Sequence, residues 1–252
     1  MTVIGSVTIA GLGPGASEDS LGVSVLDLVN SADLVIYAGV LFSDFLRDRV
    51  RGELLTGPDL EDDIIRRHVI EAYRAGKHVA WLEPGDPSLY SGEPGKFGSL
   101  SQNTAWLASS GITFRVLPGV SSLAALCARL GLEHALPEQG TPLIVYAPAR
   151  DTETVMRVRL QQILQHGFPI ALFLASERIE QVLQLAHRYL GGDARVIIGY
   201  RIGWPDELIL DCTINELLSR DCGEFPKHAI YLLGPWQGGA GTLAAAGECQ
   251  DA

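Results

Sequence analysis

A chain of 252 residues can form one large or two modest domains, and its 47% apolar content supports a sizeable core. Its formal charge of −11 disfavours a nucleic-acid partner, which would require a basic surface. No apolar run approaches the roughly 20 residues that cross a bilayer, and the N-terminus shows no signal-peptide pattern. We therefore expect a cytoplasmic chain without a membrane partner.

Short apolar runs typical of buried strands alternate with amphipathic segments along the chain. The predicted strands are residues 7–10, 34–37, 79–82, 114–117, 143–146, 170–174, 196–200, 208–212 and 229–233. Helical spacing of apolar residues is clearest at residues 59–75 and 154–165. This alternation predicts α/β architecture with mostly parallel strands, and the closely spaced strands after residue 208 predict a mixed last sheet.

The segment of residues 133–142 is the best linker candidate, because it is rich in proline and glycine and its apolar residues show no regular spacing. We expect an N-terminal α/β domain at residues 1–138 and a second α/β domain at residues 139–236. The Gly/Ala-rich tail at residues 237–252 is expected to fray. The four cysteines form no CxxC pair and no metal-ligand spacing, which indicates free thiols and no metal site.

A first glycine-rich loop, Gly11-Leu-Gly-Pro-Gly-Ala16, follows the first predicted strand and fits the G-x-G-x-x-[G/A] dinucleotide fingerprint. That fingerprint also needs an acid at the end of the second strand to bind ribose. Here the second strand ends at Tyr37-Ala-Gly, and Pro14 removes one amide donor. Both features disfavour a nicotinamide oxidoreductase.

Two further loops, Gly85-Asp-Pro-Ser-Leu-Tyr90 and Pro118-Gly-Val-Ser-Ser122, also end predicted strands. Glycine permits close approach of a ligand to the backbone, and proline keeps a loop rigid before binding. Each loop alone could be an ordinary turn, with Asp86 accepting backbone amides and a serine capping the next helix.

In this order and spacing, the three loops resemble those of the tetrapyrrole methylases, which are S-adenosylmethionine-dependent enzymes of cobalamin and sirohaem synthesis. The resemblance runs from about residue 7 to residue 236. In the C-terminal half, Ile170-Ala-Leu-Phe-Leu-Ala-Ser176 and Gly199-Tyr-Arg-Ile-Gly-Trp-Pro-Asp-Glu207 are similar to the precorrin-4 and cobalt-precorrin-4 C-11-methyltransferases of that family.

The resemblance implies two αβα domains with a cleft between them, a homodimer, and S-adenosylmethionine as the cofactor. By motif position, it implies cofactor contacts from Pro14, Gly85, Asp86, Leu89, Ser121, Ser122, Ala175 and Ile202. It implies a tetrapyrrole substrate rich in carboxylates, for which the candidate contacts are Arg201, Tyr90 and Lys96, with Arg150 as a further cation. No catalytic base is identified, because an activated methyl donor mainly requires alignment and desolvation.

The chain also departs from the family pattern. Residues 91–98 look like an insertion after Tyr90, and the Gly85–Tyr90 motif would equally suit a C-20 methylase. The leading hypothesis is C-11 methylation of precorrin-4 or cobalt-precorrin-4. The alternatives are another tetrapyrrole methylase and a non-catalytic S-adenosylmethionine-binding protein whose insertion blocks the substrate site.

Overall fold

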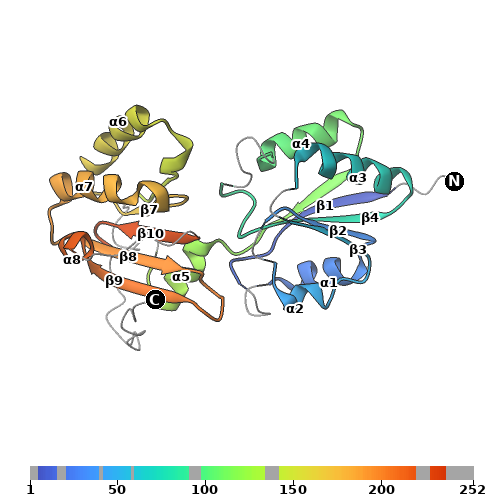
Figure 1. The fold of residues 1–252 in the computed structure, drawn as a ribbon, viewed down its shortest axis with the longest axis horizontal. Coiled ribbons are helices and arrows are strands. Elements are labelled where there is room, and N and C mark those ends of the chain that lie inside the picture. Colours follow the sequence, from blue (N-terminus) through green and yellow to red (C-terminus); the bar gives the residue numbers. More distant parts are fainter. Residues whose placement is uncertain are drawn as a thin grey trace. The chain divides into compact units, whose positions relative to one another are not determined.

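The computed structural model describes residues 5–15, 21–39, 42–57, 60–90, 98–133, 142–219 and 228–236. The chain forms two compact units (Figure 1). Unit 1 comprises Met1–Ser122 with Gly203–Pro205, and unit 2 comprises Leu123–Ile202 with Asp206–Ala252. No helix among the described residues is both long and apolar enough to cross a membrane.

Unit 1 is built on a parallel sheet with the strand order β3-β2-β4-β1-β5. Its strands are β1 (Ser6–Gly11), β2 (Leu34–Tyr37), β3 (Glu53–Thr56), β4 (His78–Glu83) and β5 (Phe114–Leu117). The residues of β2 and β4 are almost all buried, as expected for a parallel sheet that is covered on both faces.

Helices cover both faces of the first sheet. Residues from α1 (Val23–Ser31) and α2 (Asp44–Arg47) pack with Ala80 and Leu82 on one face. Residues from α3 (Asp62–Arg74) and α4 (Leu100–Ser109) pack with Val79 and Trp81 on the other. This division follows from the alternation of side chains along β4.

Unit 2 contains a mixed sheet with the strand order β6-β7-β10-β8-β9. Its strands are β6 (Ile144–Tyr146), β7 (Ile170–Leu172), β8 (Arg195–Tyr200), β9 (Leu208–Thr213) and β10 (Ala229–Leu233). β6 and β7 are parallel, whereas β10 is antiparallel to both β7 and β8, and β9 is antiparallel to β8. The carboxyl ends of β6, β7 and β8 therefore share one edge.

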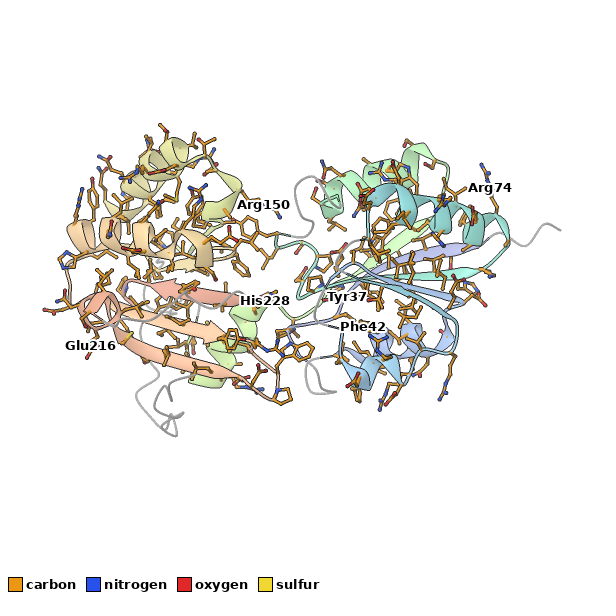
Figure 2. The ribbon with its side chains drawn as sticks, viewed as in Figure 1. Tyr37, Phe42, Arg74, Arg150, Glu216 and His228 are labelled. Atoms are coloured by element: carbon orange, nitrogen blue, oxygen red, sulfur yellow. The ribbon has the colours of Figure 1, made fainter. Side chains whose placement is uncertain are left out.

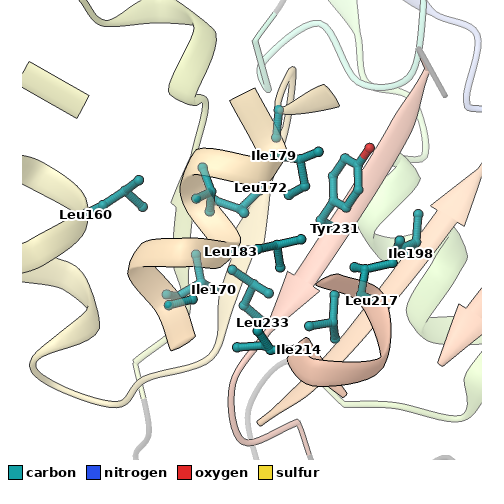
Figure 3. Packing of buried hydrophobic residues seen from close by; sticks show 14 of the residues in the cluster. Leu160, Ile170, Leu172, Ile179, Leu183, Ile198, Ile214, Leu217, Tyr231 and Leu233 are labelled. Atoms are coloured by element: carbon teal, nitrogen blue, oxygen red, sulfur yellow. The ribbon is translucent and has the colours of Figure 1, made fainter. Parts of the chain in front are cut away.

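Three helices cover one face of this sheet: α6 (Glu153–Leu164), α7 (Ile179–Leu190) and α8 (Ile214–Ser219). Figure 3 shows part of this packing, in which Leu183 of α7 and Ile214 of α8 lie beside apolar residues of the strands. Helix α5 (Ser122–Leu130) covers the opposite face and packs against Ala171 and Ile197. Each unit is therefore an αβα sandwich.

The structure confirms the α/β class and the mixed character of the last sheet. All the predicted strands are present, although β7 ends at Leu172 instead of residue 174. The strand β3 and the two short 3₁₀ segments, Pro148–Arg150 and Ser176–Arg178, were not predicted.

The two units divide after Ser122, whereas the sequence placed the boundary near residue 138. The difference arises because α5 packs its apolar residues into the core of unit 2. Most of the expected linker and the whole expected tail lie outside the described residues. The cleft between the two domains stays a prediction.

Candidate functional site

The three glycine-rich loops meet at the carboxyl edge of the first sheet. They follow β4, β1 and β5, which are neighbours in the strand order. The chain leaves β1 toward α1 on one face and leaves β4 toward α4 on the other. In open α/β sheets, ligands bind at such a switch point beyond the carboxyl ends of the strands.

Glycines hold the three loops in direct backbone contact. Gly13 and Gly85 exchange two hydrogen bonds, with N···O distances of 3.1 and 3.0 Å. A Cβ added to Gly11 would lie 2.5 Å from the Gly85 carbonyl oxygen and 2.6 Å from the Gly119 amide nitrogen. A Cβ added to Gly119 would also strike the Gly85 carbonyl. At Gly11 and Gly119, glycine is therefore required by contact between loops and not by a ligand.

Gly85 differs from these two glycines. Its φ is +63°, in the left-handed region, and a Cβ added there would meet no atom within 4 Å. The backbone conformation favours glycine, and the space beside it is open. Gly85 is thus the loop glycine that leaves room for a ligand against the main chain.

The rest of this loop is stabilised by its own hydrogen bonds. Asp86 accepts from the Ser88 amide at 2.8 Å and from the Ser88 hydroxyl at 2.7 Å, as in an Asx turn. The Leu89 amide donates to the Asp86 carbonyl at 3.0 Å. Tyr90 ends the loop with a φ of +58°, an uncommon value for a non-glycine residue. Asp86 therefore has a clear structural role.

The remaining predicted cofactor residues of unit 1 lie on the same loops. Pro14 is half-buried beside Gly15, against which Gly203 packs, since a Cβ on Gly203 would lie 2.8 Å from the Gly15 Cα. Ser121 immediately precedes α5, and Ser122 is its first residue. Both serines are half-buried. The structure thus gathers all six of these residues onto three touching loops of one unit.

The two predicted cofactor residues of unit 2 are buried at the shared edge of its sheet. Ala175 follows β7, is 0% exposed, and accepts a hydrogen bond from the Arg178 amide at 2.8 Å. Ile202 follows β8 and packs into the core around α5. Because both side chains are buried, only their main chains could reach a ligand. Leu174, with a φ of +51°, is 48% exposed at the same edge.

Arg201, the predicted substrate contact, lies at this edge with a φ of +45°. Its Nε donates to Asp206 at 2.7 Å, and its backbone amide donates to the His228 carbonyl at 3.3 Å. His228 is exposed just before β10 (Figure 2). The neighbouring Glu207 accepts from Arg129 Nε at 3.2 Å. Lys96, the other predicted cation, lies outside the described residues.

Two charged residues, one in each unit, were not identified from sequence. The first is Glu83, the last residue of β4, which is only 4% exposed. Burial and, to a lesser extent, the charge of Asp62 raise the pKa of the Glu83 carboxyl to about 8. Its position two residues after Trp81 puts it on the same face of β4 as that buried side chain, and this spacing is the signal that could have revealed it.

The second is Arg129, in the last turn of α5. It is separated from its partner Glu207 by 78 positions, so no local pattern could have paired them. Among the described residues, no cluster of three or more His, Cys, Asp or Glu side chains could hold a metal ion.

Comparisons with known proteins identify the family of the chain. The family model described as Tetrapyrrole (Corrin/Porphyrin) Methylases matches residues 6–218. A precorrin-4 C(11)-methyltransferase of Pseudomonas aeruginosa is 28% identical over 231 residues, which cover 91% of this chain and 89% of that relative.

Solved structures give the same result for the fold. A cobalt precorrin-4 methyltransferase of cobalamin biosynthesis aligns with a TM-score of 0.77 and 27% identity, over 91% of this chain and 94% of that one. A uroporphyrin-III C-methyltransferase from Thermus thermophilus, complexed with S-adenosylhomocysteine, aligns with a TM-score of 0.68. At 19% identity, over 91% of this chain and 97% of that one, this second likeness is one of fold.

Proposed function

The chain belongs to the tetrapyrrole methylases and is a methyltransferase, and from this premise we propose that it methylates C-11 of precorrin-4 or cobalt-precorrin-4 with S-adenosylmethionine as the methyl donor. The observation that carries the proposal is the likeness to a precorrin-4 C(11)-methyltransferase along 91% of this chain. The solved cobalt-precorrin-4 enzyme supports the same substrate class. Whether the macrocycle carries cobalt is an outcome of the experiment below.

The loops of unit 1 fit the proposed methyl donor. Gly85 offers an open space beside a left-handed backbone, and its own hydrogen bonds to Gly13 fix that backbone before any ligand arrives. Such preorganisation reduces the entropy lost on binding. Pro14, Asp86, Leu89, Ser121 and Ser122 are proposed as the other contacts in this unit, and Ala175 and Ile202 as main-chain contacts from unit 2.

When bound, S-adenosylmethionine supplies an already activated methyl group. The protein's own contribution is to orient that group toward the substrate carbon and to exclude water. The rigid Asp86–Ser88 turn would keep the loop aligned, and Tyr90 and Arg201 would contact the substrate. Lys96 is proposed as a third substrate contact.

The experiment is incubation of the purified protein with S-adenosylmethionine and with either precorrin-4 or cobalt-precorrin-4. Carbon-13 labelling of the donor methyl group allows the methylated carbon to be mapped by NMR. We expect a new methyl signal at C-11. Methylation at C-20 would instead establish the alternative regiochemistry. Donor binding without transfer to any tetrapyrrole would establish the non-catalytic alternative.

Donor binding is tested separately by thermal denaturation with S-adenosylhomocysteine. A ligand that binds only the native state stabilises by about 2.7 kcal/mol at 100-fold excess over Kd. Absence of a shift at millimolar ligand would contradict the cofactor assignment. We also propose a cytoplasmic homodimer, for which gel filtration with light scattering tests the oligomeric state.

A further inference from the structure

The turn between β8 and β9 contains two adjacent acids, and each is paired with an arginine. Asp206 accepts from Arg201 Nε at 2.7 Å, and Glu207 accepts from Arg129 Nε at 3.2 Å. Asp206 and Glu207 are neighbours in the chain, so both ion pairs involve the same turn. The arginines come from α5 and from the end of β8, which are distant in sequence.

Arg129 retains capacity to bind an anion. A guanidinium carries five N–H donors, and Glu207 engages Arg129 through Nε. Within the described ranges, the Nη atoms of Arg129 have no hydrogen-bond partner, and its side chain is 54% exposed. Glu207 is more buried than Arg129, with 21% of its side chain exposed.

The backbone around this turn is fixed in an uncommon conformation. Arg201 and His228 both have positive φ values, +45° and +68°, and the Arg201 amide donates to the His228 carbonyl. Non-glycine residues adopt this region only where their surroundings enforce it, and such residues gather at functional sites.

The charge of the protein supports a local role for these arginines. A chain with a net charge of −11 would repel a substrate with many carboxylates unless cations were concentrated where the substrate binds. Arginine suits this task because its planar fork matches a carboxylate. We infer that Arg129, positioned by Glu207, binds a peripheral carboxylate of the tetrapyrrole substrate beside Arg201. This inference rests on the proposed function.

The experiment compares Arg129→Ala with a matched control, Arg157→Ala. Arg157 is another exposed arginine of unit 2, paired with Glu153 at 3.0 Å, and 53% of its side chain is exposed. For Arg129→Ala we expect about a tenfold rise in the tetrapyrrole KM, with kcat and the affinity for S-adenosylhomocysteine unchanged. The rise should shrink at high salt, because exposed charges are screened. Arg157→Ala should behave as the wild type does.

Two more variants separate binding from positioning. Arg129→Lys keeps the positive charge but removes the planar guanidinium, and it should raise the tetrapyrrole KM by a smaller factor than Arg129→Ala does. Glu207→Ala should raise KM in the wild-type background but add nothing to Arg129→Ala, since the acid would act through the arginine.

An unchanged tetrapyrrole KM in Arg129→Ala, with wild-type turnover intact, would overturn this inference and leave the proposed function standing. An equal effect of Arg157→Ala would also overturn it, because a general loss of surface charge would then suffice. If the wild type methylates neither tetrapyrrole, the proposed function fails, and the inference fails with it.

Discussion

The buried carboxyl of Glu83 should make the stability of unit 1 depend on pH. Burial, followed by the charge of Asp62, raises the pKa of Glu83 from 4.5 to about 8 in the folded protein. Asp62 stays engaged nearby, accepting from the Gly98 amide at 3.0 Å and from Arg66 Nη2 at 3.1 Å. At neutral pH the folded state therefore keeps a proton on Glu83 that the unfolded chain has released.

The direction and magnitude of this pH dependence follow from proton linkage. The folded state binds more protons between pH 4.5 and about 8, so the contribution of Glu83 to stability is fully present below pH 4.5 and is lost as pH rises toward 8. Each pH unit within this window changes the free energy of unfolding by about 1.4 kcal/mol. Between pH 5.5 and 8, Glu83 alone should therefore remove about 3 kcal/mol of stability.

Glu83→Gln tests this, because glutamine keeps the shape and stays neutral at every pH. We would measure urea unfolding from pH 5.5 to 8 by tryptophan fluorescence, to which Trp81, buried on the same face of β4, contributes. In the variant, the free energy of unfolding should not fall with rising pH, so the variant should become more stable than the wild type as pH rises. The control is Glu71→Gln, at an exposed position of α3, which should keep the wild-type slope. If the free energy of unfolding depended on pH in the same way in the wild type and in Glu83→Gln, the reasoning would be refuted.

Three further predictions follow from the loops and the turn. Gly85→Val should abolish binding of S-adenosylhomocysteine. The control Gly111→Val should retain binding, although Gly111 has a similar φ of +68° and equally open space. Isothermal titration calorimetry of both folded variants tests this, and normal affinity in Gly85→Val would place the ligand elsewhere. Gly119→Ala should lower the free energy of unfolding by about 1–3 kcal/mol, because the new methyl group collides with the Gly85 carbonyl. Urea titration measures this change, and a free energy of unfolding equal to that of the wild type would contradict the prediction. Arg201→Ala should raise the tetrapyrrole KM by about 10-fold or more and leave the KM of the methyl donor unchanged; the opposite pattern would assign Arg201 to the donor.

The sequence predicted most of the fold because buried strands of a parallel sheet are nearly continuous apolar runs. The run that precedes Glu83 and the run at residues 34–37 have this character, and both are strands in the structure. The missed strand β3 is a short edge strand, and none of its residues is fully buried. Its pattern therefore carried little signal. The packing of α5 in unit 2 carried no local signal, because its side chains contact residues of later strands such as Ala171, Ile197 and Ile230.

The candidate site shows a second limit of sequence reasoning. The glycine motifs correctly indicated where the loops are, but they could not show what each glycine is for. Gly11 and Gly119 are explained by backbone contact with the neighbouring loop, whereas Gly85, of these three, combines a left-handed φ with open space. A substitution at Gly119 should thus act through stability, and one at Gly85 through binding. Only the packing of three loops from separate parts of the chain makes this distinction, and the pairing of Arg129 with Glu207 depends on the same kind of long-range contact.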